Sequence, residues 1–464
     1  MMEQHRVTTL LDAEKVENLR KGLRGELLRP GDASYESARK IHNGMIDRRP
    51  KIIIRCAGVA DVLRAVRFAR EHELLIAVRG GGHGVPGFAV CDRGMMIDLS
   101  PMKSVRVDSS RRTALAEGGV TWGEFDHETQ AFGLATTGGV ARPTGVAGLT
   151  LGGGQGFLMR KHGLACDNLL SVDVVTADGR RLRASATENA DLFWGVRGGG
   201  GNFGIVTSFE YQLHSVGPIL GGLVIYPMSQ ASALLKIYRD FTASAPDDLG
   251  PLAVLATLPD GTPAAATLLC YSGVAAEGER LLAPLRAFGP PIADQVALMP
   301  YTALQSIVEN FNPPGLRNYW KALYMKDLTD DAIKVLVGQY ATVPSPNTHV
   351  VLYTMGGAVA RIGADETAVG YRDALHTLLI VGMWTDSAED EVNIHWIRSF
   401  WETMKPFASG GFYVNYETET GVESVRAAYG PSKYERLAAL KAKYDPTNLF
   451  RLNQNILPAS GRVV

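Results

Sequence analysis

The first half of the chain alternates between hydrophobic runs spaced for strands and hydrophobic stripes spaced for helices. Residues 51–55 form a β-branched run that predicts a strand, and apolar residues between 59 and 66 recur at helical spacing. A second strand is predicted at 74–78. A strand, a helix and a strand within about thirty residues are typical of a crossover.

This alternation continues as far as residue 215. It predicts further strands at 95–99, 105–108, 113–117, 170–176, 181–183 and 203–213, and helices at 122–132 and 190–194. The pair Asp178-Gly179 lies between two of these strands and indicates a hairpin turn. Glycine-rich stretches interrupt the pattern at 80–84, 144–156 and 198–201.

From residue 216 the glycine clusters thin out and the pattern changes. Strands are predicted at 223–226, 252–258, 266–271 and 350–354, and helices with a stripe of core residues are predicted around 234–241, 333–340 and 397–404. The last sixty residues return to turn-rich polar motifs. We expect an α+β protein of two domains, because 464 residues exceed one ordinary core. Residues 1–215 and 406–464 would form one domain, and 216–405 an antiparallel sheet backed by helices.

The composition argues against several classes of binding partner but identifies none. The formal net charge is −1, which gives no electrostatic case for binding nucleic acid or an anionic membrane surface. The four cysteines are scattered, so neither a zinc site nor a redox dithiol is expected. Neither a membrane span nor a secretory leader is visible, and we expect a cytoplasmic protein, a monomer or a homodimer.

The glycine-rich stretches carry the candidate chemistry. In the first, a short strand runs into Gly80-Gly-Gly-His83-Gly84, where bare backbone amides could hold a diphosphate. The letters also fit a dinucleotide fingerprint, but Pro86 favours a loop where that fingerprint needs a helix. The chain has no phosphate-binding loop of the triphosphatase type. Three glycine loops together favour an elongated cofactor held along its backbone.

The glycine loops and several other motifs together resemble the flavin-linked oxidases of the vanillyl-alcohol oxidase superfamily, and among them the bacterial berberine-bridge-enzyme-like group. The resemblance runs over residues 35–457 and lies in segments 79–84, 144–156, 160–168, 174–179, 202–206, 413–416 and 453–456. It implies a PCMH-type FAD-binding domain at 1–215, a substrate domain at 216–405 and a berberine-bridge-like return at 406–464. It also implies FAD as cofactor.

The resemblance implies a role for individual residues. His83 matches the histidine that is bonded to the flavin, and segment 140–144 has no cysteine for a second bond, so a single attachment is expected. Cys166 is interpreted as a residue of the cofactor pocket. The remaining cofactor-binding residues would be Arg79, Gly80, Gly81, Gly82, Gly84, Thr144, Gly145, Gly148, Thr150, Gly152, Gly153, Gly156, Asp167, Asn168, Gly204, Ile205, Val206, Tyr413, Asn415, Asn453 and Asn455.

The expected reaction is hydride transfer to FAD from a C–H bond next to oxygen or nitrogen, with O₂ reoxidising the flavin to give H₂O₂. By resemblance Tyr416 faces the substrate, and Lys321 is a candidate cation that would let it act as a base. The alternatives are a dehydrogenase with another electron acceptor, and a protein that holds flavin without turnover. The aromatic residues Tyr319, Trp320, Tyr324, Tyr353 and Trp384 suit a planar or apolar small molecule, but amines, phenolic alcohols and sugars all stay open.

Overall fold

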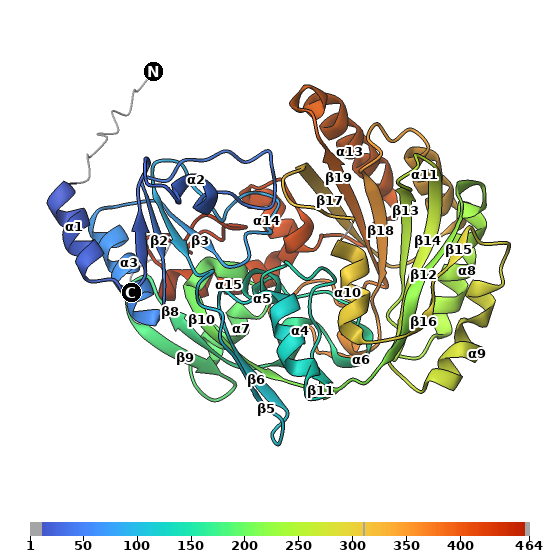
Figure 1. Ribbon diagram of the computed structural model, residues 1–464, viewed down its shortest axis with the longest axis horizontal. Coiled ribbons are helices and arrows are strands. Elements are labelled where there is room, and N and C mark those ends of the chain that lie inside the picture. Colours follow the sequence, from blue (N-terminus) through green and yellow to red (C-terminus); the bar gives the residue numbers. More distant parts are fainter. Residues whose placement is uncertain (1–11, 310, 460–464) are drawn as a thin grey trace.

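The computed structural model describes residues 12–309 and 311–459, and part of the N-terminal segment considered above lies outside them. The described chain forms two bodies side by side, one rich in short strands and one built on a single large sheet (Figure 1). The α+β prediction is confirmed, with helices packed on antiparallel sheets. No described helix is long and apolar enough to cross a membrane.

A small sheet near the N-terminus carries the first glycine loop. Its strands lie in the order β1 (Glu26–Leu28), β2 (Ile52–Arg55), β4 (Met95–Asp98) and β3 (Ile76–Arg79), and β2 and β3 both run parallel to β4. The helix α3 (Val59–Glu71) packs its apolar stripe against this sheet. The predicted strand, helix and strand are therefore confirmed, with β4 inserted between the two strands that α3 connects.

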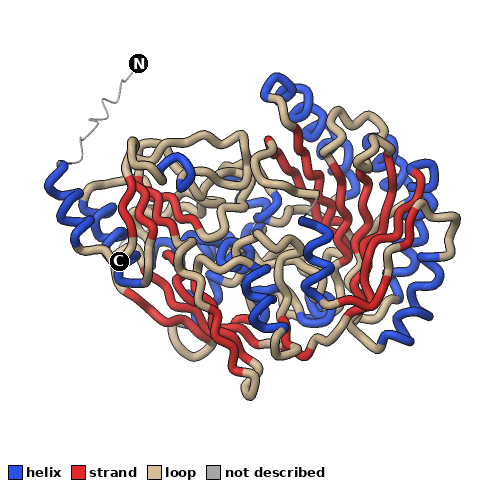
Figure 2. Tube along the Cα trace, viewed as in Figure 1, coloured by secondary structure: helices blue, strands red, loops and turns tan. Residues whose placement is uncertain are grey.

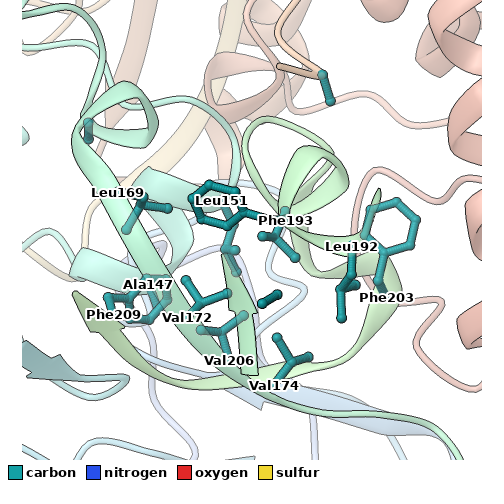
Figure 3. Close-up of a cluster of buried hydrophobic side chains, with 14 of the residues drawn as sticks. Ala147, Leu151, Leu169, Val172, Val174, Leu192, Phe193, Phe203, Val206 and Phe209 are labelled. Atoms are coloured by element: carbon teal, nitrogen blue, oxygen red, sulfur yellow. The ribbon is translucent and has the colours of Figure 1, made fainter. Parts of the chain in front are cut away.

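A second, antiparallel sheet supports the other glycine loops. Its order is β5 (Val105–Asp108), β6 (Thr113–Glu117), β10 (Ile205–Gln212), β8 (Leu169–Val175) and β9 (Arg181–Ser185). The predicted hairpin is confirmed, because β8 and β9 pair in antiparallel register around Asp178-Gly179. One face is covered by α5 (Val146–Leu151) and α7 (Ala190–Val196), whose apolar side chains meet those of β8 and β10 (Figure 3).

The third sheet dominates the other body. Its strands run β15 (Ala293–Asp294), β12 (Ile219–Pro227), β14 (Pro263–Tyr271), β13 (Leu252–Thr257), β18 (His349–Thr354), β19 (His376–Trp384) and β17 (Arg317–Met325), and β16 (Ala297–Met299) also pairs with β12. Four helices cover its outer face: α8 (Ala231–Ser244), α9 (Ala275–Arg286), α11 (Asp330–Tyr340) and α13 (Asp390–Met404) (Figure 2). Alternate side chains therefore point to the helices or toward the other body.

The shorter described elements connect these layers. They are α1 (Ala13–Lys21), α2 (Tyr35–Ala38), α4 (Trp122–Gln130), β7 (Leu134–Ala135), α6 (Met159–His162), β11 (His214–Ser215), α10 (Tyr301–Glu309) and α12 (Ala358–Arg361), with 3₁₀ turns at Ala165–Asn168, Gly200–Phe203, Met228–Gln230, Ser387–Glu389, Lys405–Phe407 and Val414–Tyr416. β7 and β11 pair with each other.

The C-terminal segment holds two helices that the turn-rich pattern did not predict. These are α14 (Val422–Tyr429) and α15 (Pro431–Tyr444), and they pack into the core of the first body (Figure 1). At the end of α15 the buried ammonium of Lys441 donates to Asp445 and to the backbone carbonyls of Asn202 and Phe450. The two helices lie between the turn-rich motifs, and α15 keeps a buried, paired charge at its end.

Candidate functional site

A cavity of about 390 Å³ lies between the glycine loops and the inner face of the large sheet. One wall is backbone: it includes Gly80–Gly82, Gly145, Gly148, Gly152, Gly200 and Gly201. The opposite wall consists of side chains from β12, β13, β14, β18, β19 and β17. The two bodies therefore each contribute one wall of the same site.

His83 follows β3 and lines this cavity. The side chain is half-buried, and its Nε2 atom is buried with no hydrogen-bond partner among the described residues. Burial and the neighbouring imidazole of His42 lower the pKa of His83 to about 3. The ring is therefore neutral at physiological pH, which leaves a nitrogen lone pair available to react.

Two glycine loops touch each other at the base of the cavity. A Cβ atom on Gly81 would lie 2.4 Å from the backbone nitrogen of Gly145, and a Cβ on Gly145 would meet Gly81 at the same distance. By contrast, the space beside Gly84 and Gly148 is open to 4 Å. Only residues without a side chain permit this close approach, and the result is a wall of exposed peptide groups suited to an anion.

Many of the predicted cofactor residues line the cavity. They are Gly80, Gly81, Gly82, His83, Gly84, Thr144, Gly145, Gly148, Gly152, Gly204, Ile205, Val206, Asn415 and Asn453, and Tyr416 lines it as well. The others, namely Arg79, Thr150, Gly153, Gly156, Cys166, Asp167, Asn168, Tyr413 and Asn455, do not line it among the described residues.

Arg79 was expected to contact the diphosphate, but its side chain is used within the small sheet. The guanidinium forms a bidentate ion pair with the buried carboxylate of Asp98, at 2.9 and 2.6 Å, and donates to the carbonyls of Ala38 and Lys40. The guanidinium therefore lies off the cavity, and a contact of Arg79 with the cofactor stays a prediction. The role of this side chain is to fix the end of β3, from which the first glycine loop departs.

The segment around Cys166 packs behind the second glycine loop and supports it. The Asp167 carboxylate pairs with the buried guanidinium of Arg372 at 2.7 and 3.0 Å, and Asn168 donates to the carbonyls of His162 and Leu164. Burial raises the pKa of the Cys166 thiol well above its usual value. Asp167 and Asn168 hold the 3₁₀ turn Ala165–Asn168 in place. None of the three residues lines the cavity, and their contact with the cofactor stays a prediction.

Four other expected residues pack behind the wall. Thr150 Oγ1 lies 2.7 Å from the Tyr211 hydroxyl, a Cβ on Gly156 would lie 1.8 Å from the Gly138 carbonyl oxygen, and Gly153 has a φ of +125°. The Tyr413 hydroxyl accepts from the backbone N–H of Gly154 at 2.7 Å. Each of these contacts supports the backbone of the second glycine loop, and contact of these residues with a cofactor stays a prediction.

The C-terminal segment brings acceptors to the cavity. Asn415 donates to the carbonyl of Leu149 and to the Tyr413 hydroxyl, which holds this segment against α5. Asn453 donates to the carbonyl of Phe450, while its own Oδ1 is buried without a partner. The Oδ1 of Asn455 is buried and unpartnered as well, although this residue lies off the cavity lining.

Tyr416 lines the cavity, but Lys321 does not lie beside it as the expected cation. Burial and neighbouring tyrosines raise the pKa of Tyr416 well above its usual value, so its hydroxyl is protonated. Lys321 is buried on the helix-covered side of β17, where its ammonium pairs with Glu417 and Glu419 at 3.0 Å each and lies over the Trp401 ring. Strand alternation explains the error, because Trp320 takes the position facing the cavity.

Some cavity residues were missed by the sequence analysis. Gln155, Gln454, Asn312 and His349 line the cavity, and His42 stacks on His83 from behind. Of the five aromatic residues thought to suit a planar substrate, Trp320 and Tyr353 line it, whereas Tyr319 and Trp384 pack toward the helices. Tyr324 packs in the same cluster as Trp320 and Tyr353 but is not part of the lining. Gln155 lies inside the second glycine stretch and Gln454 inside segment 453–456, so both could have been found there, whereas Asn312, His349 and His42 have no local signal.

The residues present fit an FAD molecule. Four residues of the cavity wall, His83, Gln155, Asn453 and Gln454, each carry a buried polar atom that lacks a partner within the described parts of the chain. Such atoms are costly unless a ligand satisfies them. The glycine amides suit the diphosphate, and the unpartnered oxygens suit the donors of the ribityl chain and ring edge.

Comparison with known proteins points the same way. Residues 50–185 match the model of the FAD binding domain, and residues 412–457 match that described as berberine and berberine like. The chain is 32% identical to (R)-6-hydroxynicotine oxidase of Paenarthrobacter nicotinovorans, over 94% of this chain and 97% of that protein. The crystal structure of 6-hydroxy-D-nicotine oxidase from Arthrobacter nicotinovorans superposes with a TM-score of 0.87 at 31% identity, covering 94% and 98% of the two chains. A chitooligosaccharide oxidase superposes with a TM-score of 0.85 at 26% identity, covering 96% and 99%.

Proposed function

Because this chain belongs to the berberine-bridge-enzyme-like family of FAD-linked oxidoreductases, we propose that it is an oxidase whose flavin is attached through His83 alone. When bound, FAD accepts a hydride from the substrate and returns the electrons to O₂ as H₂O₂. The single observation that carries the proposal is the position of His83, a neutral imidazole with a buried, unpartnered Nε2 on the wall of the cavity that fits FAD.

We propose one attachment point, His83. Residues 140–144, before the second glycine loop, contain no cysteine, and Cys166 is fully buried behind that loop. A covalent bond to His83 fixes the position of the ring and withdraws electron density from it, which favours the acceptance of hydride.

Tyr416 is proposed to position the substrate. It lines the cavity with a protonated hydroxyl, which can donate a hydrogen bond to the oxygen or nitrogen next to the reacting C–H bond. No aspartate, glutamate, lysine or arginine of the described chain lines the cavity. The enzyme therefore acts by orienting the substrate and excluding water, and the protonated Tyr416 is not itself the resting base.

The test of attachment uses two histidines with similar environments. His83→Ala should release all flavin into the supernatant on acid precipitation, while wild type gives a yellow pellet. His162→Ala is the matched control, because His162 also has an unpartnered Nε2 and a pKa lowered to about 3, but lies off the cavity. A colourless wild-type pellet would contradict the attachment. Reoxidation of the reduced enzyme by air that is far slower than turnover would contradict the oxidase and favour a dehydrogenase.

A further inference from the structure

The inner face of the large sheet forms the substrate side of the cavity, and its side chains follow the strand register. Val254 on β13 pairs with Val351 on β18 and with Ala266 on β14. The same row continues through Ile225 on β12 and Leu379 on β19. All five residues line the cavity, so an uninterrupted aliphatic strip crosses five adjacent strands.

The rows on either side of this strip are also poor in hydrogen-bonding groups. Leu223, Leu268 and Leu252 lie in one neighbouring row, which ends at Tyr353. In the other row Trp320, Val381 and His349 line the cavity, and the indole N–H of Trp320 is already donated to Asn318 Oδ1 at 3.1 Å. Burial lowers the pKa of His349 to about 4, so its imidazole is uncharged at neutral pH. The hydroxyl of Tyr416 and the amide of Gln155 also line the cavity, and both groups are uncharged.

This lining limits what the site can take. No formally charged side chain of the described residues lines the cavity, so a carboxylate or ammonium on the substrate would lose its hydration without gaining a partner. A sugar has the same difficulty on a smaller scale, because the hydroxyls that lie on the aliphatic strip would face methyl groups. A flat hydrocarbon body would instead displace water from apolar surface.

We infer that the substrate is a neutral, flat and largely apolar molecule with one hydroxyl or neutral nitrogen directed at Tyr416 and Gln155, and not a sugar or a charged compound. The inference rests on the proposed function and specifies its substrate class. Phe311, which lines the cavity and is 39% exposed, extends the apolar surface to the outside.

Three probes test the inference directly. Titration calorimetry on the protein as purified should show that 2-naphthol binds at least tenfold more tightly than 2-naphthoate, its charged counterpart, and than cellobiose. Tight binding of cellobiose or 2-naphthoate, equal to or better than that of 2-naphthol, would overturn the inference, as would failure of 2-naphthol to bind. Flavin content is measured separately by absorbance, so that loss of the proposed cofactor and loss of the proposed selectivity are distinguished.

Two isosteric substitutions on β18 test where on the sheet 2-naphthol binds. Val351→Thr places a hydroxyl in the middle of the aliphatic strip and should weaken 2-naphthol binding about fivefold or more. Val350→Thr is the matched control, because Val350 is equally a buried β18 valine but packs toward the helices. Equal affinities in the two variants would overturn the placement of the substrate on the strip.

Discussion

His42 stacks on His83, with the ring centroids 4.0 Å apart and the ring planes 22° from parallel. His42 is itself held by Asn312, whose Oδ1 lies 3.0 Å from the Nε2 of His42. These two contacts therefore connect the N-terminal segment, the first glycine loop and the loop after α10. His42 supports one face of the His83 ring.

The first prediction concerns this stack. His42→Ala removes the support of one face of His83, and we expect the covalently held fraction of flavin to fall severalfold because the imidazole is less well oriented. His42→Phe keeps a flat ring and should retain more attached flavin. The measurement is flavin fluorescence of the protein band on a denaturing gel. Full attachment in His42→Ala would show that the stack is not needed.

The second prediction separates two glycines of the same loop. Gly81→Ala would force a methyl group against the backbone of Gly145, and we expect loss of flavin and a lower unfolding temperature. Gly84→Ala meets nothing within 4 Å and should keep the fold. Absorbance of the purified variants gives the flavin content. A normal spectrum in Gly81→Ala would contradict the close contact between the loops.

The third prediction tests Tyr416. Tyr416→Phe removes the proposed hydrogen bond to the substrate and should lower kcat/KM by about tenfold to a hundredfold, with flavin content unchanged. Tyr413→Phe is the comparison, because Tyr413 lies off the cavity and supports Gly154. That variant should lose thermal stability more than it loses activity per bound flavin. An unchanged kcat/KM in Tyr416→Phe would remove Tyr416 from the reaction.

The fourth prediction assigns Lys321 to stability. Lys321→Met leaves the buried Glu417 without its partner and should cost about 3–5 kcal/mol in the free energy of unfolding. Lys405 lies over the same Trp401 ring but is exposed and pairs with Glu402, so Lys405→Met should cost less than about 1 kcal/mol. Chemical denaturation gives both values. Loss of activity in Lys321→Met without loss of stability would return Lys321 to a catalytic role.

The fifth prediction concerns Asp126 on α4, which is fully buried against α10. Desolvation raises the pKa of Asp126 to about 7, despite a hydrogen bond of 2.6 Å from Gln305 Nε2. Between about pH 4 and pH 7 the unfolded carboxyl is ionised while the folded one stays protonated, so this group lowers stability progressively as the pH rises, and the effect is constant above pH 7.

Asp126→Asn keeps an acceptor for Gln305 and removes the ionisation. We expect the variant to be more stable than wild type at pH 8, by up to ~4 kcal/mol, and the difference to shrink toward pH 4. Unfolding temperatures of both proteins from pH 4.5 to 8 provide the measurement. A stability difference that does not change with pH would contradict the raised pKa.

The amino-acid sequence alone determined the local features of the site. Strand and helix periodicity in residues 51–215 identified the elements, and the glycine stretches with His83 identified the wall that holds the cofactor, because glycine content and spacing are local properties. The motifs were also sufficient to identify the family.

Only the tertiary structure decided which side chains reach the cavity. Arg79 and Asp167 lie within the recognised motifs, and Lys321 was expected beside Tyr416. Each of these charges is instead paired with a residue that packing brings close, 19, 205 or 96 positions away along the chain. The same packing buries α14 and α15, although their sequence looks polar. It also directs an aliphatic face of the large sheet toward the substrate. A residue's neighbours along the chain set its backbone, but the burial and pairing of its side chain depend on distant segments.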